Sequence, residues 1–122
     1  MTLYTDILVR SPPESVQNYV QQAFVANEYR ITWDGPQQGR AEKGSRGANI
    51  ALGAFAQYYA IDFRLGPGPG GTTLRLLQSN SGAVGGLLGM DRVKKQFQAL
   101  SRSIATWFQQ GGILLGVNEG KI

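Results

Sequence analysis

The chain has 122 residues, of which 42% are hydrophobic and 16% charged, and its formal net charge at pH 7 is +4. These values indicate a single domain over residues 1–122, and no apolar run approaches the roughly 18–20 residues that span a bilayer. The chain contains neither Cys nor His, which excludes disulfides, thiolate chemistry, Ser-His-Asp triads and most zinc sites. The first residues lack the basic start and apolar block of a secretory signal, so we expect a cytoplasmic protein without metal or cofactor.

The positive charge is concentrated in residues 39–110, where nine basic and three acidic side chains give a net charge of +6. Residues 1–38 carry a net charge of −2, and residues 111–122 are neutral. A basic region of this kind either attracts anions, nucleic acid or an acidic membrane surface, or forms an ordinary solvated face. Its candidate binding residues are Lys43, Arg46, Arg92, Lys94 and Lys95, with Arg102 further along the chain.

The first quarter of the chain indicates a strand followed by a helix. Residues 2–10 alternate between two sets of side chains, one of them the more apolar, as a half-buried strand does. Ser11 precedes Pro12 and lies three residues before Glu14. This spacing predicts a capping box, with Ser11 as the N-cap and Pro12 as the first helical residue. The helical spacing continues to a plausible stop at Asn27.

The middle of the chain indicates further strands. Residues 29–33 and 72–79 alternate in the manner of strands, and residues 39–43 predict a short polar strand that is either an edge or strongly solvated. Residues 58–65 alternate as well. Residues 48–56 are small and apolar without a clear period, which leaves open a bent strand with a bulge or a short helical turn.

The last third of the chain indicates a long amphipathic helix over residues 90–110. Apolar side chains recur there at steps of three and four, which places them in one stripe along about six helical turns. The stripe consists of Met90, Val93, Phe97, Leu100, Ile104 and Trp107. Gly111 and Gly112 predict the C-cap, and residues 111–122 then form a tail with an apolar part at 113–117.

This order predicts an α+β fold, β-α-β-β-β-β-α, with an antiparallel sheet of about five strands and a long C-terminal helix across one face. The order resembles the helix-grip arrangement of the TBP-like fold, and it is similar to Bet v 1/START-type lipid-binding domains, although it is shorter. The resemblance covers nearly the whole chain as topology only. No sequence motif accompanies it, so it assigns no residue a role.

Two glycine-rich stretches each share one feature with phosphate-binding loops: the first has the glycine spacing, and the second precedes a helix. Gly66, Gly68 and Gly71 match G-x-G-x-x-G, but a strand-like segment follows and two prolines remove amides, so we interpret the stretch as a hairpin turn. The glycines at 82–89 do precede a helix and would hold an anion with Arg92. They lack a Lys-Ser/Thr pair, however, and Asp91 already occupies the positive helix end.

The acidic residues do not indicate catalysis. Four of them are expected on strands or turns, and nothing in their spacing brings two together in a cleft. These four are Asp6, Asp34, Glu42 and Asp62. Cross-strand ion pairs of Asp62 with Arg64 and Arg75 are the simpler expectation. We therefore expect a protein that is not an enzyme.

Six aromatic residues are expected between the sheet and the long helix, where they either line a pocket or fill it. They are Tyr19, Trp33, Tyr59, Phe63, Phe97 and Trp107. We expect a non-catalytic binding module that holds a small apolar or amphipathic ligand, or a protein partner, between the helix and the sheet. One alternative is nucleic-acid or anionic-surface binding through the basic residues 39–110. Another is a small structural protein that self-associates through a free edge at 39–43 and the apolar residues 113–117.

Overall fold

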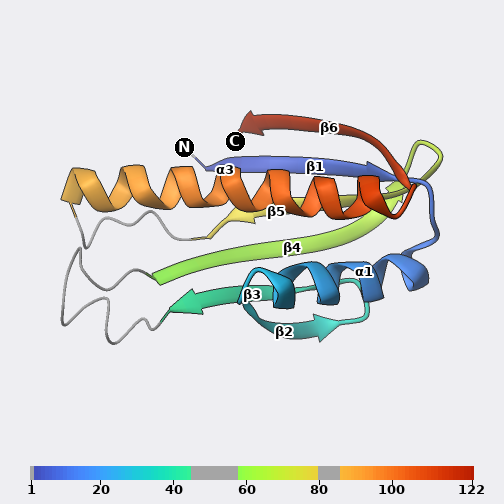
Figure 1. The fold of residues 1–122 in the computed structure, drawn as a ribbon, viewed down its shortest axis with the longest axis horizontal. Helices are drawn as coiled ribbons and strands as arrows, with labels where there is room; N and C mark the ends of the chain where they lie inside the picture. The colour runs from blue at the N-terminus through green and yellow to red at the C-terminus, as the bar shows by residue number, and fades with distance from the viewer. Residues whose placement is uncertain (1, 45–57, 80–85) are drawn as a thin grey trace.

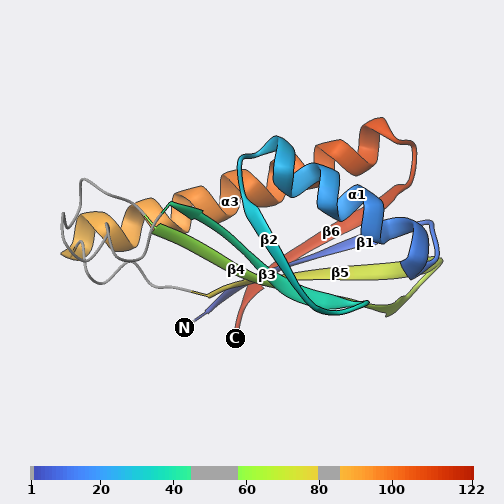
Figure 2. The same ribbon diagram turned by 90° about the horizontal axis from the view of Figure 1, so that it is seen from below.

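The computed structural model describes residues 2–44, 58–79 and 86–122, and it shows a six-stranded antiparallel sheet with two helices packed on one of its faces (Figures 1 and 2). The strands are β1 (Leu3–Val9), β2 (Arg30–Gly35), β3 (Gln38–Gly44), β4 (Tyr58–Gly68), β5 (Gly71–Gln78) and β6 (Leu114–Lys121). The helices are α1 (Pro13–Ala26) and α3 (Gly86–Gln110). The predicted α+β class, with the long C-terminal helix against the sheet, is confirmed. No helix in the described residues is long and apolar enough to cross a membrane.

The strand order is β2-β3-β4-β5-β1-β6, so the first strand of the chain lies inside the sheet and the last lies at its edge. Ile7 of β1 faces Leu74 of β5 on one side and Val117 of β6 on the other. The sheet therefore has one strand more than predicted, because residues 114–121 form β6 and not a loose tail.

Two glycines concealed β6 in the sequence. Gly116 separates Leu115 from Val117, and Gly120 follows two polar residues, so the sequence showed no clear strand pattern and indicated a tail. The structure gives Gly120 a packing role, because a Cβ atom there would lie 2.7 Å from the ring of Tyr4. The glycine thus provides room for a tyrosine of the neighbouring strand.

The short polar strand predicted at 39–43 is β3, and it is not an edge. It pairs with β2 on one side and with β4 on the other. Gly39 and Ala41 are the residues that it turns toward the helices, and both are buried. A Cβ atom at Gly39 would lie 2.8 Å from Cζ of Phe63, so the small residue makes room for a large one. The edges of the sheet are β2 and β6.

α1 begins one residue later than predicted, and the predicted capping box is wrong. Pro12 is the N-cap, Pro13 is the first helical residue, and no side chain caps the helix. The backbone oxygen of Ser11 accepts a hydrogen bond from Oγ1 of Thr72 at 2.6 Å, which ties the start of α1 to β5. The stop at Asn27 is confirmed, and Nδ2 of Asn27 donates to the carbonyl of Ala23 at 2.7 Å.

α3 begins at Gly86, ahead of the predicted Met90, and its first turns extend beyond the ends of the strands (Figures 1 and 2). Met90 is 42% exposed as a result, and the predicted stripe is wrong at this position. At the other end Phe108 is fully buried, whereas Trp107 is only partly buried against the core. Gly112, with φ +75°, ends the helix as predicted.

A hairpin joins β4 and β5, as predicted, but the two strands stay paired as far as Gly68 and Gly71. The turn is therefore shorter than predicted, with Gly70 at φ +80°. Residues 48–56, for which the sequence left open a bent strand or a helical turn, lie outside the described residues. The same holds for Arg46 and for the glycines at 82 and 85.

Candidate binding surfaces

The layer between the helices and the sheet contains the aromatic candidates, but they are distributed along its length. Trp33 packs edge-on against Phe63, with ring centroids 5.0 Å apart, and its Nε1 donates to Oε1 of Gln21 at 2.8 Å. Tyr19 contacts Phe108 at 5.7 Å. The structure therefore does not bring the six residues together around one common space.

Tyr59 and Phe97 are the two candidates that line a cavity together. Its volume is about 10 Å³, which corresponds to about one water molecule. Its lining residues are Tyr29, Tyr59, Ala60, Ile61, Gln78, Val93 and Phe97. The aromatic side chains thus fill the layer at this point, and Phe97 also lines a larger hollow of about 190 Å³ with Leu3 and Gln98. Phe24 completes the packing with a ring 5.4 Å from that of Phe63, and the helical spacing of α1 had already placed it on the apolar face.

Two tyrosines join this packed layer to the basic residues. The hydroxyl of Tyr29 accepts a hydrogen bond from Nε2 of Gln96 at 3.3 Å, and burial raises the pKa of Tyr29 to about 12. Nζ of Lys43 lies 5.8 Å from the centre of the Tyr29 ring. Burial also raises the pKa of Tyr59, while the charge of Arg92 acts in the opposite direction. Lys43 of β3 therefore lies near Tyr29, and Arg92 of α3 lies near Tyr59.

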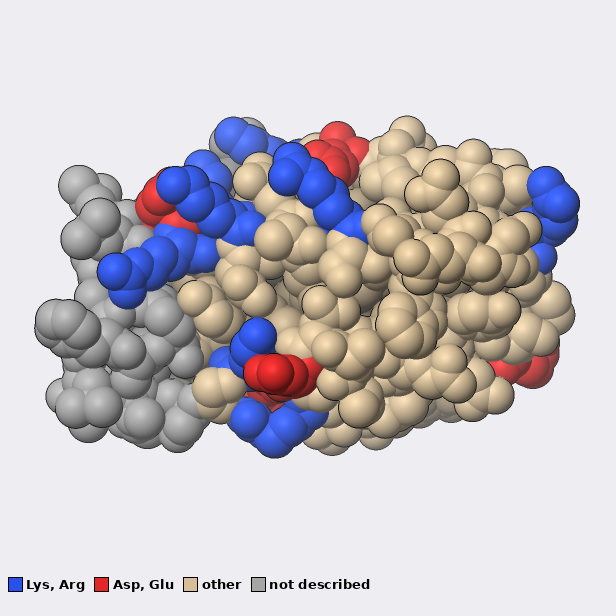
Figure 3. Space-filling model, in the orientation of Figure 1, with Lys and Arg blue, Asp and Glu red and all other residues tan. Residues whose placement is uncertain are grey.

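The basic candidates within the described residues lie at one end of the molecule, where β3 ends and where β4 and α3 begin (Figure 1). We call this region the basic end, and it comprises Lys43, Arg92, Lys94 and Lys95. Arg30, whose Nη2 donates to the carbonyl of Gly44, lies on the other face of the sheet. In Figure 3, Lys and Arg side chains gather over the beginning of α3, beside the grey residues. Most of the half over the end of α3 and over α1 carries no charge.

The two lysines that α3 contributes to the basic end, Lys94 and Lys95, are exposed. Lys95 makes an exposed ion pair with Asp91 one turn earlier, with Nζ and Oδ2 3.0 Å apart. Lys94 makes no ion pair within the described residues. An exposed pair at this spacing contributes only about 0.3–0.5 kcal/mol, so Lys95 can exchange Asp91 for an external anion at little cost.

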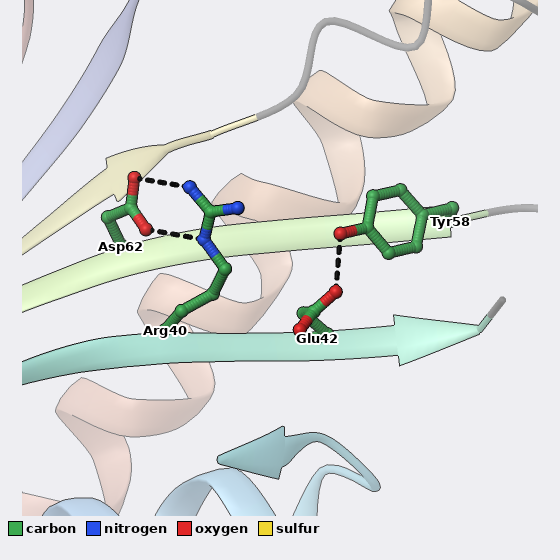
Figure 4. Close-up of polar contacts among 4 residues, drawn as sticks. All are labelled: Arg40, Glu42, Tyr58 and Asp62. Atoms are coloured by element: carbon green, nitrogen blue, oxygen red, sulfur yellow. Dashed lines mark hydrogen bonds and ion pairs between the residues drawn. The ribbon is translucent and has the colours of Figure 1, made fainter. Parts of the chain in front are cut away.

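Within the described residues, the sheet face opposite the helices is not covered by another element, and two ion pairs cross its strands. Nε of Arg40 lies 2.8 Å from Oδ1 of Asp62, and the hydroxyl of Tyr58 donates to Oε2 of Glu42 at 2.5 Å (Figure 4). The expected pairs of Asp62 with Arg64 and Arg75 are wrong. The strand register sets Arg40 directly opposite Asp62.

Arg75 pairs instead with Asp6 of β1. Its Nε lies 2.8 Å from Oδ1 of Asp6, and its guanidinium carbon lies 4.7 Å from the centre of the Tyr4 ring. Within the described residues the open face carries four arginines and four carboxylates: Arg30, Arg40, Arg64 and Arg75 with Asp6, Asp34, Glu42 and Asp62. This face is therefore neutral, and the excess positive charge lies elsewhere. The described residues contain no cluster of acidic side chains that could hold a metal ion.

No protein-family model matches this sequence, and no curated protein matches it. A solved structure has a similar fold. The crystal structure of protein MLL2253 from Mesorhizobium loti superposes with a TM-score of 0.62, over 90% of this chain and 98% of that chain, at 14% sequence identity. At this identity the similarity concerns the fold alone.

Proposed function

We propose that this chain is a non-catalytic binding module that attaches through its basic end to a surface bearing phosphate groups. The observation that carries the proposal is that Lys43 of β3 lies at the same end of the molecule as Arg92, Lys94 and Lys95 of α3, although residues 44–91 separate them in sequence. Clustered positive charge raises the local concentration of anions and speeds their association.

The chemistry of the basic end favours phosphate groups over nucleotide bases. Binding of single-stranded nucleic acid depends on exposed aromatic rings for stacking. Among the described aromatic residues at this end, Tyr29 is 3% exposed and Tyr59 packs against the core. Tyr58 is partly buried, and its hydroxyl donates to Glu42. Flexible lysines then act as point charges toward phosphate oxygens. The partner is therefore a phosphate-rich surface that is bound without sequence preference.

The structure gives less support to the alternative that a small ligand binds between α3 and the sheet. The cavity that Tyr59 and Phe97 line together measures about 10 Å³, so an apolar ligand in it would have to displace one of these side chains. The resemblance to helix-grip domains stays part of the proposal at the level of topology, and it implies no internal ligand for this chain.

The test compares two double variants that remove the same charge from different places. Lys94→Gln/Lys95→Gln neutralises the basic end, and Arg10→Gln/Arg102→Gln neutralises two exposed arginines outside it. Binding is measured by sedimentation with phosphatidylcholine vesicles, with and without phosphatidylserine, and by anisotropy with duplex DNA. We expect the lysine variant to lose about 30-fold in affinity, or about 1 kcal/mol for each lysine near the surface, and the arginine variant to lose far less.

Salt dependence provides the second readout. Affinity of the unmodified chain should fall steeply as salt increases, and loss of two phosphate contacts should reduce the slope by about two on duplex DNA. Preference for phosphatidylserine vesicles would identify an acidic membrane as the source of the phosphates, and preference for DNA would identify a nucleic acid. Equal losses in the two variants, or weak binding without a salt slope, would contradict the proposal.

A further inference from the structure

β6 forms one edge of the sheet, and the side that faces away from β1 has no partner strand in the described residues. Thr2 and Ile122 exchange two backbone hydrogen bonds, of 3.1 and 2.8 Å. Hydrogen-bonded pairs alternate along an antiparallel ladder. Gly116, Asn118 and Gly120 therefore direct their amides and carbonyls toward β1. The amides and carbonyls of the residues between them point outward.

The outward-directed backbone belongs to Val117, Glu119 and Lys121, and their side chains share one face of the sheet with Leu115. Leu115 is 42% exposed and Val117 is 40% exposed. Glu119 and Lys121 line a hollow beside Gln98 of α3, so the helix does not cover this edge. An uncovered edge with exposed apolar side chains is a template for another strand.

The opposite edge, β2, is protected in ways that β6 is not. β2 has six residues and β6 has eight. α1 packs beside β2, where Gln21 accepts the hydrogen bond from Trp33 and Gln17 donates to the carbonyl of Pro36. β6 contains no proline, and its two charged residues carry opposite signs. Two β6 edges therefore meet without net repulsion.

We infer that β6 pairs antiparallel with β6 of a second copy of this chain, which joins the two sheets into one. A two-fold axis places the same groups on both sides, so each outward amide of one copy meets an outward carbonyl of the other. This interface is independent of the basic end, and it does not rest on the proposed function.

The side chains select one register. With Asn118 opposite Asn118 of the second copy, the strands overlap over their whole length. Leu115 then lies against Lys121, and Val117 lies against Glu119, so that long polar side chains cover apolar ones. A shift by two residues in one direction sets Glu119 against Glu119, which is unfavourable. The same shift in the other direction leaves Lys121 beyond the end of the partner strand.

The absence of cysteine in the chain allows a direct test of this register. In the proposed pairing, Asn118 and its counterpart form a non-hydrogen-bonded pair with Cα atoms about 4.5 Å apart, within the range that a disulfide bridges. We expect Asn118→Cys to form a covalent dimer rapidly under mild oxidation. Thr32→Cys, at an exposed site on β2, is the matched control and should stay largely monomeric.

Light scattering of the unmodified chain complements the cross-linking and should give twice the monomer mass of 13.2 kDa. Val117→Pro removes an outward amide that the ladder with β1 does not use, so it should yield a folded monomer by circular dichroism. A monomer at all concentrations, equal cross-linking of the two cysteine variants, or an unchanged dimer in folded Val117→Pro would overturn the inference. If Val117→Pro does not fold, the two cysteine variants still decide it.

Discussion

Tyr29 packs in the core, and this burial changes the pKa of its hydroxyl. Its ring packs 5.8 Å from that of Phe24, and burial raises its pKa to about 12, against about 10 in an unfolded chain. Because the folded state holds the phenolic proton more tightly, its contribution to stability is complete below about pH 10 and is lost as the pH rises toward 12. We expect the free energy of unfolding to fall by about 1 kcal/mol between about pH 9 and pH 11 through this group.

Urea unfolding of the unmodified chain and of Tyr29→Phe isolates this effect. Tyr59 contributes a change of the same sign, since its pKa is also raised, so the informative quantity is the difference between the two proteins. The slope of stability against pH should become shallower in Tyr29→Phe. Identical slopes in the two proteins would show that the hydroxyl of Tyr29 is not desolvated by folding.

Sequence patterns placed individual side chains on the correct face but could not identify their neighbours. Alternation put Trp33 and Phe63 on the helix side of the sheet, and the structure confirms both positions. Their edge-on contact depends on the pairing of three strands, which no local pattern encodes. The ion pair of Asp62 was predicted wrongly for the same reason, because a cross-strand partner follows from register alone.

At the scale of elements, the buried face of α3 differs from the predicted stripe at its two ends. Phe108 is fully buried and Met90 is 42% exposed. We expect Phe108→Ala to lower the free energy of unfolding by about 3–5 kcal/mol, since it leaves a cavity in the core. Met90→Ala should change it by less than about 0.5 kcal/mol. Chemical denaturation of the two variants tests this ranking, and a larger cost at Met90 would contradict the observed position of α3.

Elements were predictable from the sequence where the apolar pattern of a helix or strand continued without interruption. The predictions were wrong where a glycine or a proline interrupted that pattern. α3 and β1 were recognised because their patterns extend over many residues. β6 was missed because Gly116 and Gly120 occupy the positions that face Leu8 and Tyr4. The start of α1 shifted by one residue because either of two adjacent prolines suits the first helical position. The sequence predicted the basic residues of the basic end. It could not predict that Lys43 lies beside α3, because this depends on the fold.

At the scale of the whole molecule, β1 is the strand that pairs the N-terminal segment of the chain with its C-terminal segment inside the sheet. β1 pairs with β5 on one side and with β6 on the other, so both pairings connect segments distant in sequence. Such non-local pairing makes folding slow and cooperative, because the entropy cost of closing long loops comes before the stabilisation from the strand contacts. The sheet is therefore expected to unfold as one unit.

Removal of residues 114–122 tests this dependence. The truncated chain would expose the edge of β1, and Ile7 would lose the neighbouring Val117 while remaining part of the core. We expect loss of the cooperative thermal transition by circular dichroism, together with concentration-dependent aggregation through the new edge. Removal of Ile122 alone is the control, since it is 63% exposed and lies beyond the end of β6, and it should leave the transition almost unchanged. A truncated chain that remains monomeric and melts cooperatively near the original temperature would show that the other strands and the two helices form a stable unit without β6.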